Sequence, residues 1–142
     1  MKHRILSTGL VASLAVFGAS FAASAQEPDA AAAERLAGFE RTGETRNCVS
    51  LSQVRTIQPL DDRHFLIELR NRETYLNVTL GRCNQAASRN TYLQYSVPAN
   101  QLCRGEIVNV IDNGPGQFLA GTCGLGDFER LVPVENGDSA SR

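Results

Sequence analysis

Lysine and histidine are almost absent from this chain. Lys2 is its only lysine, and His3 and His64 are its two histidines. Because His64 is the one histidine beyond the N-terminal segment and no cysteines are spaced as CxxC, a zinc site is a poor interpretation of the four cysteines. No serine stands in a nucleophile-elbow motif, so a serine hydrolase triad has no local signature. The glycine-rich segment 121–126 lacks the lysine and the following helix of a phosphate-binding loop, and we expect it to allow tight turns beside a cystine.

The N-terminal segment has the three parts of a secretory signal. A cationic start with Lys2 and Arg4 precedes an apolar run from Ile5 to Ala22, and an Ala-x-Ala site ends at Ala25. We therefore expect residues 1–25 to be a signal peptide that is cleaved off. The run approaches the length of a membrane span, but the cleavage site and the acidic sequence after it argue against an anchor, so no membrane span is expected after cleavage. Lipid attachment would need a cysteine at the cleavage point, and the chain has none there.

Cleavage leaves a mildly acidic chain of ordinary domain length. Without Lys2 and Arg4, twelve arginines face fifteen acidic residues, which gives a net charge of −3 over 117 residues. This balance lacks the basic surface of a nucleic-acid-binding protein, and no nucleic acid is expected as a partner.

The four cysteines indicate two disulfides, because an exported chain meets an oxidising environment. Three pairings of Cys48, Cys83, Cys103 and Cys123 are conceivable. Loop-closure entropy does not decide among them. We favour Cys48–Cys123 with Cys83–Cys103, since the first and last cysteines would then join the two ends of the domain.

The rest of the chain divides into three parts. Residues 26–47 read as a flexible leader with a short alanine-rich helix that stops near Gly38, an isolated helix of marginal stability. Leu36 and Phe39 are placed to pin this leader to the domain. Residues 48–134 form the disulfide-stapled domain, and 135–142 are a polar, disordered tail.

Short alternating segments in residues 48–134 predict an all-β fold. In 64–70, Phe65, Ile67 and Leu69 are expected to face the core and His64 to face water, with Leu66 as an exception on the wet side. The β-branched run 106–111 is typical of a central strand, and 112–116 is the strongest turn signal. We expect a small antiparallel meander or barrel-like roll of five to seven short strands.

Candidate catalytic residues are few. Asp61-Asp62-Arg63-His64 is the densest polar cluster, and Asp62 with His64 could form an acid–base pair or a weak metal site. The favoured interpretation is structural: the aspartates build a turn, and neighbouring strand residues point to opposite faces. The Asn77-Val78-Thr79 glycosylation sequon lies in a predicted strand and is read as chance. Six arginines, which could make an anion-binding face, more simply form a mixed surface with acidic neighbours: Arg63, Arg70, Arg72, Arg82, Arg89 and Arg104.

Four segments of the domain resemble a family of small exported bacterial proteins, a domain of unknown function. They are Cys48-Val49-Ser50-Leu51-Ser52-Gln53-Val54-Arg55, Leu60-Asp61-Asp62-Arg63, Gln101-Leu102-Cys103-Arg104-Gly105-Glu106-Ile107-Val108 and Cys123-Gly124-Leu125-Gly126-Asp127-Phe128. The resemblance covers residues 48–134 with all four cysteines. It implies an envelope location and a compact β fold, and it brings no catalytic residues. Asn84-Gln85 stands where the family tends to have proline and glycine, so the geometry of this loop does not follow from it.

These observations favour a non-enzymatic binding or structural module of the bacterial periplasm or exterior, without cofactor or metal, whose partner is an envelope or extracellular protein or ligand. An apolar or aromatic patch from Tyr75, Tyr92 and Tyr95 would then be expected. Two alternatives stay open: a small hydrolase that uses Asp62 and His64, and an inhibitor of a secreted enzyme that displays a rigid loop such as 112–116.

Overall fold

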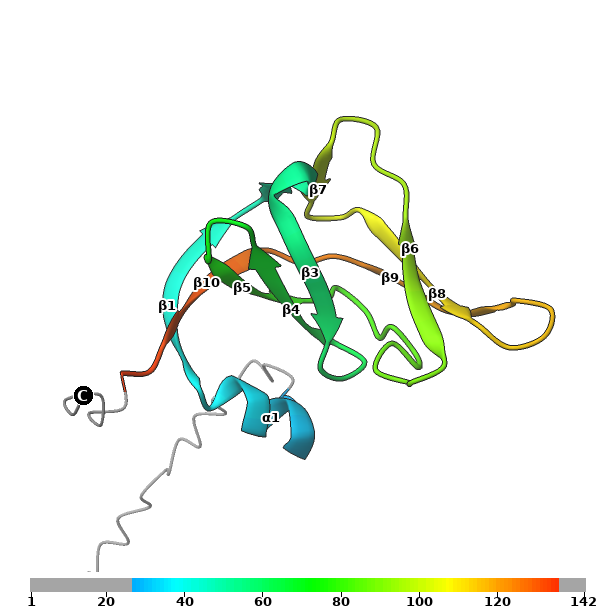
Figure 1. Ribbon diagram of the computed structural model, residues 1–142, viewed down its shortest axis with the longest axis horizontal. Coiled ribbons are helices and arrows are strands. Elements are labelled where there is room, and N and C mark those ends of the chain that lie inside the picture. The colour runs from blue at the N-terminus through cyan, green and yellow to red at the C-terminus, as the bar shows by residue number, and fades with distance from the viewer. Residues whose placement is uncertain (1–26, 136–142) are drawn as a thin grey trace, which may run out of the picture.

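Antiparallel strands dominate the computed structural model, which describes residues 27–135 (Figure 1). The predicted signal peptide and all of the predicted tail except Glu135 lie outside these residues. The elements in chain order are α1 (Ala30–Leu36), β1 (Phe39–Arg46), β2 (Cys48–Ser50), the short 3-10 helix η1 (Leu51–Gln53), β3 (Val54–Pro59), β4 (His64–Leu69), β5 (Thr74–Val78), β6 (Thr91–Tyr95), β7 (Gln101–Cys103), β8 (Ile107–Asp112), β9 (Leu119–Gly124) and β10 (Phe128–Pro133). No helix among them is long and apolar enough to cross a membrane.

The strands form three antiparallel sheets, so the prediction of an all-β fold is confirmed. The largest sheet has the order β1-β10-β5-β4-β3, a second joins β2 to β7, and a third has the order β6-β8-β9. The described part of the chain thus contains ten strands rather than five to seven, and the sheets do not close into a single barrel. β2 and β7 were not predicted, because a strand of only three residues is too short to show an alternating pattern.

The leader is part of the fold. Residues 39–46 were expected to be flexible, yet they form β1, an edge strand that pairs with β10 from Phe39–Pro133 to Arg46–Phe128. Seven of its eight residues are exposed, so no burial pattern marked it as a strand. Backbone hydrogen bonds to β10 stabilise it instead. The two ends of the domain are therefore joined by strand pairing and not by a disulfide.

The short helix of the leader is confirmed and covers one face of the large sheet. Asp29 caps α1, where its Oδ1 accepts from the backbone N–H of Ala32 at 2.8 Å. Leu36 and Phe39 pack as expected against a small core cluster. Its buried members are Ala32, Leu60, Leu66, Leu76 and Leu131.

The opposite face of this sheet packs against the third sheet to form the main core. Phe65, Ile67 and Leu69 of β4 lie there, as their alternation predicts. Leu66 belongs to the other face, but it is buried rather than wet because α1 covers it. A strand covered on both sides carries apolar residues on both sides, which explains the apparent exception in the pattern.

The disulfides are Cys48–Cys103 and Cys83–Cys123, so the favoured pairing was wrong. Cys48 lies directly opposite Cys103 where β2 pairs with β7. The loop after β5 brings Cys83 against Cys123 of β9. Gly121 allows this approach, since a Cβ there would lie 2.5 Å from the backbone oxygen of Asn84.

Candidate functional site

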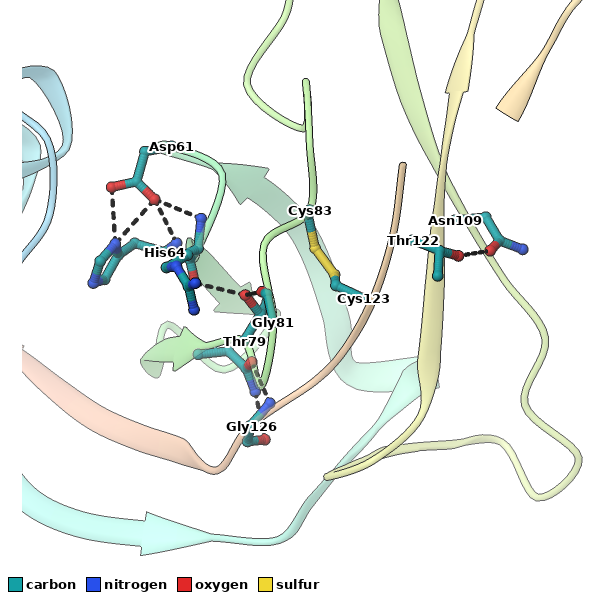
Figure 2. The surroundings of a disulfide bond; sticks show 11 residues. Asp61, His64, Thr79, Gly81, Cys83, Asn109, Thr122, Cys123 and Gly126 are labelled. Atoms are coloured by element: carbon teal, nitrogen blue, oxygen red, sulfur yellow. Dashed lines mark hydrogen bonds and ion pairs between the residues drawn. A yellow bond between two sulfur atoms is a disulfide. The ribbon is translucent and has the colours of Figure 1, made fainter. Parts of the chain in front are cut away.

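Asp61 is the centre of a buried polar cluster at the junction of α1 and β4 (Figure 2). Its carboxylate closes the turn before β4, because Oδ1 accepts from the backbone N–H groups of Arg63 and His64, each at 2.7 Å. Oδ2 accepts from the backbone N–H of Asp29 at 3.1 Å, which ties the start of α1 to the same turn. The predicted aspartate turn is thus confirmed, with Asp61 as the residue that builds it.

His64 completes this cluster. Its Nδ1 lies 2.9 and 2.8 Å from the two oxygens of Asp61. The side chain was expected to face water, but only 4% of His64 is exposed. It shares its face of β4 with Leu66, and this is the face that α1 covers.

The pKa of Asp61 lies below the ordinary value for aspartate. Burial acts to raise this pKa, but the backbone N–H donors of Arg63, Asp29 and His64 and the ring of His64 lower it and prevail. Asp61 is therefore ionised at neutral pH, and an ionised carboxylate beside Nδ1 holds the proton of a neutral imidazole on Nδ1. In a neutral imidazole with its proton on Nδ1, the second ring nitrogen, Nε2, is a lone-pair acceptor.

His64 lines a cleft of about 370 Å³. No described residue donates a hydrogen bond to Nε2, while every fully buried side-chain nitrogen or oxygen in residues 27–135 has a partner. Figure 2 shows Nε2 on the side of the ring away from Asp61. The cleft is lined by Glu27, Asp29, Asp61, Asp62, Arg63, His64, Arg82 and Ala87.

The hydrolase alternative required Asp62 to pair with His64, and the structure does not show this pair. Its carboxylate accepts from the guanidinium of Arg82 at 2.8 Å, and its backbone oxygen accepts from the N–H of Cys83 at 2.7 Å. Asp61 takes the position beside the imidazole instead. The lining residues of the cleft include no hydroxyl or thiol group that His64 could activate as a nucleophile. Among the described residues no three acidic, histidine or cysteine side chains are placed to hold a metal ion.

Two of the six arginines that the sequence singled out make ion pairs with acidic side chains. Arg82 pairs with Asp62 at 2.8 Å, and Arg104 pairs with Asp127 at 3.0 Å. Arg41 and Glu129 form a further pair between β1 and β10.

Asn77 is structural and not a glycosylation site, as the sequence favoured. Its side chain is fully buried. Its Nδ2 donates to the backbone oxygen of Gly126 at 2.8 Å, and its Oδ1 accepts from the N–H of Gly126 at 2.9 Å. Both halves of the amide are therefore used to hold the segment before β10.

The predicted tyrosine patch does not form. Tyr75 is 1% exposed, its hydroxyl donates to Glu73 at 3.0 Å, and Arg46 stacks on its ring at 4.8 Å. Burial is the largest cause that raises the pKa of Tyr75, and the hydrogen bond to Glu73 is the second. Tyr95 packs against the main core, and Tyr92 alone is exposed.

A different apolar surface lies on the outer face of the β6-β8-β9 sheet. Directly paired residues of antiparallel strands point to the same face. The pairs Tyr92–Ile111 and Ile111–Leu119 therefore make one row across the three strands. The next row is polar and consists of Gln94, Asn109 and Thr122, and the hydroxyl of Thr122 donates to Asn109.

Beyond the polar row the outer face is apolar again. Ile107 lies opposite Gly124, and the side chain of Leu80 lies 3.4 Å from the position that a Cβ of Gly124 would take. Six large apolar residues of the described chain are exposed: Leu80, Tyr92, Ile107, Phe118, Leu119 and Val134. All but Val134 lie on this sheet or directly against it. The outer face, defined here by Tyr92, Gln94, Ile107, Asn109, Ile111, Leu119 and Thr122, carries no charged residue.

The geometry defines a small all-β protein with two disulfides, a buried aspartate–histidine pair in a cleft, and an uncharged outer sheet face. Two disulfides are typical of proteins in an oxidising, extracellular type of environment. Comparison of the chain with protein-family models, with curated proteins and with solved structures found no match. The resemblance to a family of exported bacterial proteins accordingly stays a prediction.

Proposed function

We propose that the protein is a non-enzymatic binding module of the bacterial periplasm or cell exterior, and that it holds a partner protein on the outer face of the β6-β8-β9 sheet. The observation that carries the proposal is the composition of this face. It combines an aromatic residue and aliphatic residues with no charge, although one fifth of the whole chain is charged. Depletion of charge with retention of aromatic residues characterises the centres of protein interfaces.

The polar row favours a protein as the occupant over a lipid surface. Gln94 and Asn109 offer amide donors and acceptors between the two apolar ends of the face. A polypeptide can satisfy these groups with its own backbone, whereas hydrocarbon leaves them unpaired at a cost of about 1–3 kcal/mol each. In addition, β6 is an edge strand of its sheet, so its outer backbone groups are available to an added strand.

The test compares two substitutions of exposed apolar residues. Leu119→Glu places a charge on the outer face, and Val134→Glu places the same charge outside it; the two side chains are 59% and 42% exposed. Each variant would be expressed in the native host, cross-linked in the intact envelope and isolated, with thermal unfolding as a control for folding. We expect a partner of defined mass and fixed stoichiometry with the wild type and Val134→Glu, and its loss with Leu119→Glu.

Retention of that partner by Leu119→Glu, or equal loss in both variants, would refute this surface. Sedimentation of the purified wild type separates a second copy of the chain from a different partner. Flotation with phospholipid vesicles tests the lipid alternative directly.

The inhibitor alternative has one observation in its favour, the ordered loop between β8 and β9. Asp112 Oδ1 accepts from the N–H of Gly114 at 2.6 Å, and the N–H of Asn113 donates to the backbone oxygen of Asn90 at 2.8 Å. A loop held by its own hydrogen bonds loses little entropy when it binds. An inhibitor would keep its target enzyme in Leu119→Glu and lose it when residues 113–116 are replaced.

A further inference from the structure

The cleft at His64 has a hydrogen-bond acceptor in its lining that no described residue satisfies. It is Nε2 of His64, on a side chain that is only 4% exposed. The exposed carboxylates of Glu27 and Asp29 line the same cleft, and the cap of α1 uses only Oδ1 of Asp29. A nearly buried imidazole that lines an open cleft with one ring nitrogen free is oriented for a ligand, because Asp61 fixes both its tautomer and its ring position.

The charge of the lining selects the sign of that ligand. Four carboxylates and two guanidinium groups line the cleft, and together these six groups carry a net charge of −2. Asp62 and Arg82 neutralise each other as an ion pair at 2.8 Å. The remaining carboxylates of Glu27, Asp29 and Asp61 outnumber Arg63, so the cleft attracts cations and repels anions.

We propose that this cleft binds an organic primary amine, whose ammonium group donates to Nε2 of His64 and is attracted by the negative charge of the lining carboxylates. An ammonium group has three N–H donors and no acceptor, which complements a site with an unsatisfied acceptor and negative charge. A divalent metal ion is the less suitable cation, because residues 27–135 offer no set of three ligating side chains. This inference is independent of the outer sheet face, which other elements form.

Three compounds of four carbon atoms separate charge from size: putrescine is a diamine, erythritol a neutral polyol and succinate a dianion. The readout is the ring nitrogen resonance of His64 in isotope-labelled protein, recorded at about pH 8, above the ordinary titration range of histidine. Putrescine is expected to shift the Nε2 resonance saturably in the millimolar range. Erythritol should act more weakly, and succinate should not act.

Glu27→Gln removes one rim charge, and Glu44→Gln on the exposed strand β1 is the matched control. The rim substitution should weaken putrescine binding about two- to fivefold, the range of an exposed ionic contact, and the control should leave it unchanged. The inference fails if putrescine gives no saturable shift, if succinate binds as well as putrescine, or if both substitutions have the same effect. A saturable response to zinc alone would also overturn it, in favour of a metal site.

Discussion

Replacement of Asp61 is the perturbation whose effect the structure fixes best. Asp61→Ala removes the acceptor of the N–H groups of Arg63, His64 and Asp29 and of the His64 ring. A hydrogen bond to a charged group contributes about 1.5–3 kcal/mol when its partner is left unsatisfied. Because the Asp29 donor and the imidazole border the cleft, water can replace part of the loss there. We expect the free energy of unfolding to fall by about 3–5 kcal/mol, a large share of the 5–15 kcal/mol typical of a small domain.

The matched control is Asp62→Ala, one residue further along the chain. Asp62 makes an ion pair with Arg82, whose side chain is 63% exposed, and such a pair contributes about 0–1 kcal/mol. Urea unfolding of both variants, with disulfides intact, measures the difference. Losses of equal size in the two variants would refute the role of Asp61 as the centre of the cluster.

The same residue sets a pH dependence. The pKa of Asp61 is lower in the folded protein than in the unfolded chain, because hydrogen bonds to its ionised form outweigh burial. Its contribution is therefore complete above the ordinary pKa of about 4, and it disappears as the pH falls through the lowered folded value. Stability of the wild type should fall more steeply than that of Asp61→Asn between about pH 5 and pH 2. Parallel curves would show that Asp61 has an ordinary pKa.

Three further predictions concern the main sheet and the disulfides. Asn77→Ala leaves both backbone groups of Gly126 unpaired and should lower the free energy of unfolding by about 2–5 kcal/mol, measured by urea titration. Gly126→Ala should prevent native packing, seen as loss of dispersed amide resonances, since the new Cβ would overlap the backbone oxygen of Val78. Joint replacement of Cys83 and Cys123 by alanine should cost about 4 kcal/mol from the loop-entropy relation for a sequence separation of 40, measured by calorimetry.

Local patterns in the sequence predicted the parts of the fold that depend on neighbouring residues. Alternation in β4 identified Phe65, Ile67 and Leu69 as core residues, and the alanine-rich stretch identified α1. Where the outcome depends on distant segments, local reasoning failed. β1 is exposed along almost its whole length and forms because it pairs with β10. The residue pattern of β1 alone gives no indication of this pairing.

The candidate site shows the same division. The cluster from Asp61 to His64 was recognised, and its turn-forming role follows from the chemistry of aspartate. Its burial was missed, since it depends on α1, which lies about thirty residues earlier in the chain and covers that face of β4. The sequence did contain one indication of this burial, Leu66, because an apolar residue on the same face as His64 indicates that the face is covered. The disulfide pairing depends on sheet topology, which the spacing of the cysteines in the sequence does not reveal.

Two disulfides, formed in an oxidising compartment and joining β2 to β7 and the loop after β5 to β9, hold the sheets that carry both proposed sites. Peptide mapping of the protein isolated from its native host without reduction tests this claim most directly. We predict Cys48–Cys103 and Cys83–Cys123 peptides, with no free thiol. Free cysteines, or a peptide that links Cys48 to Cys123, would contradict it.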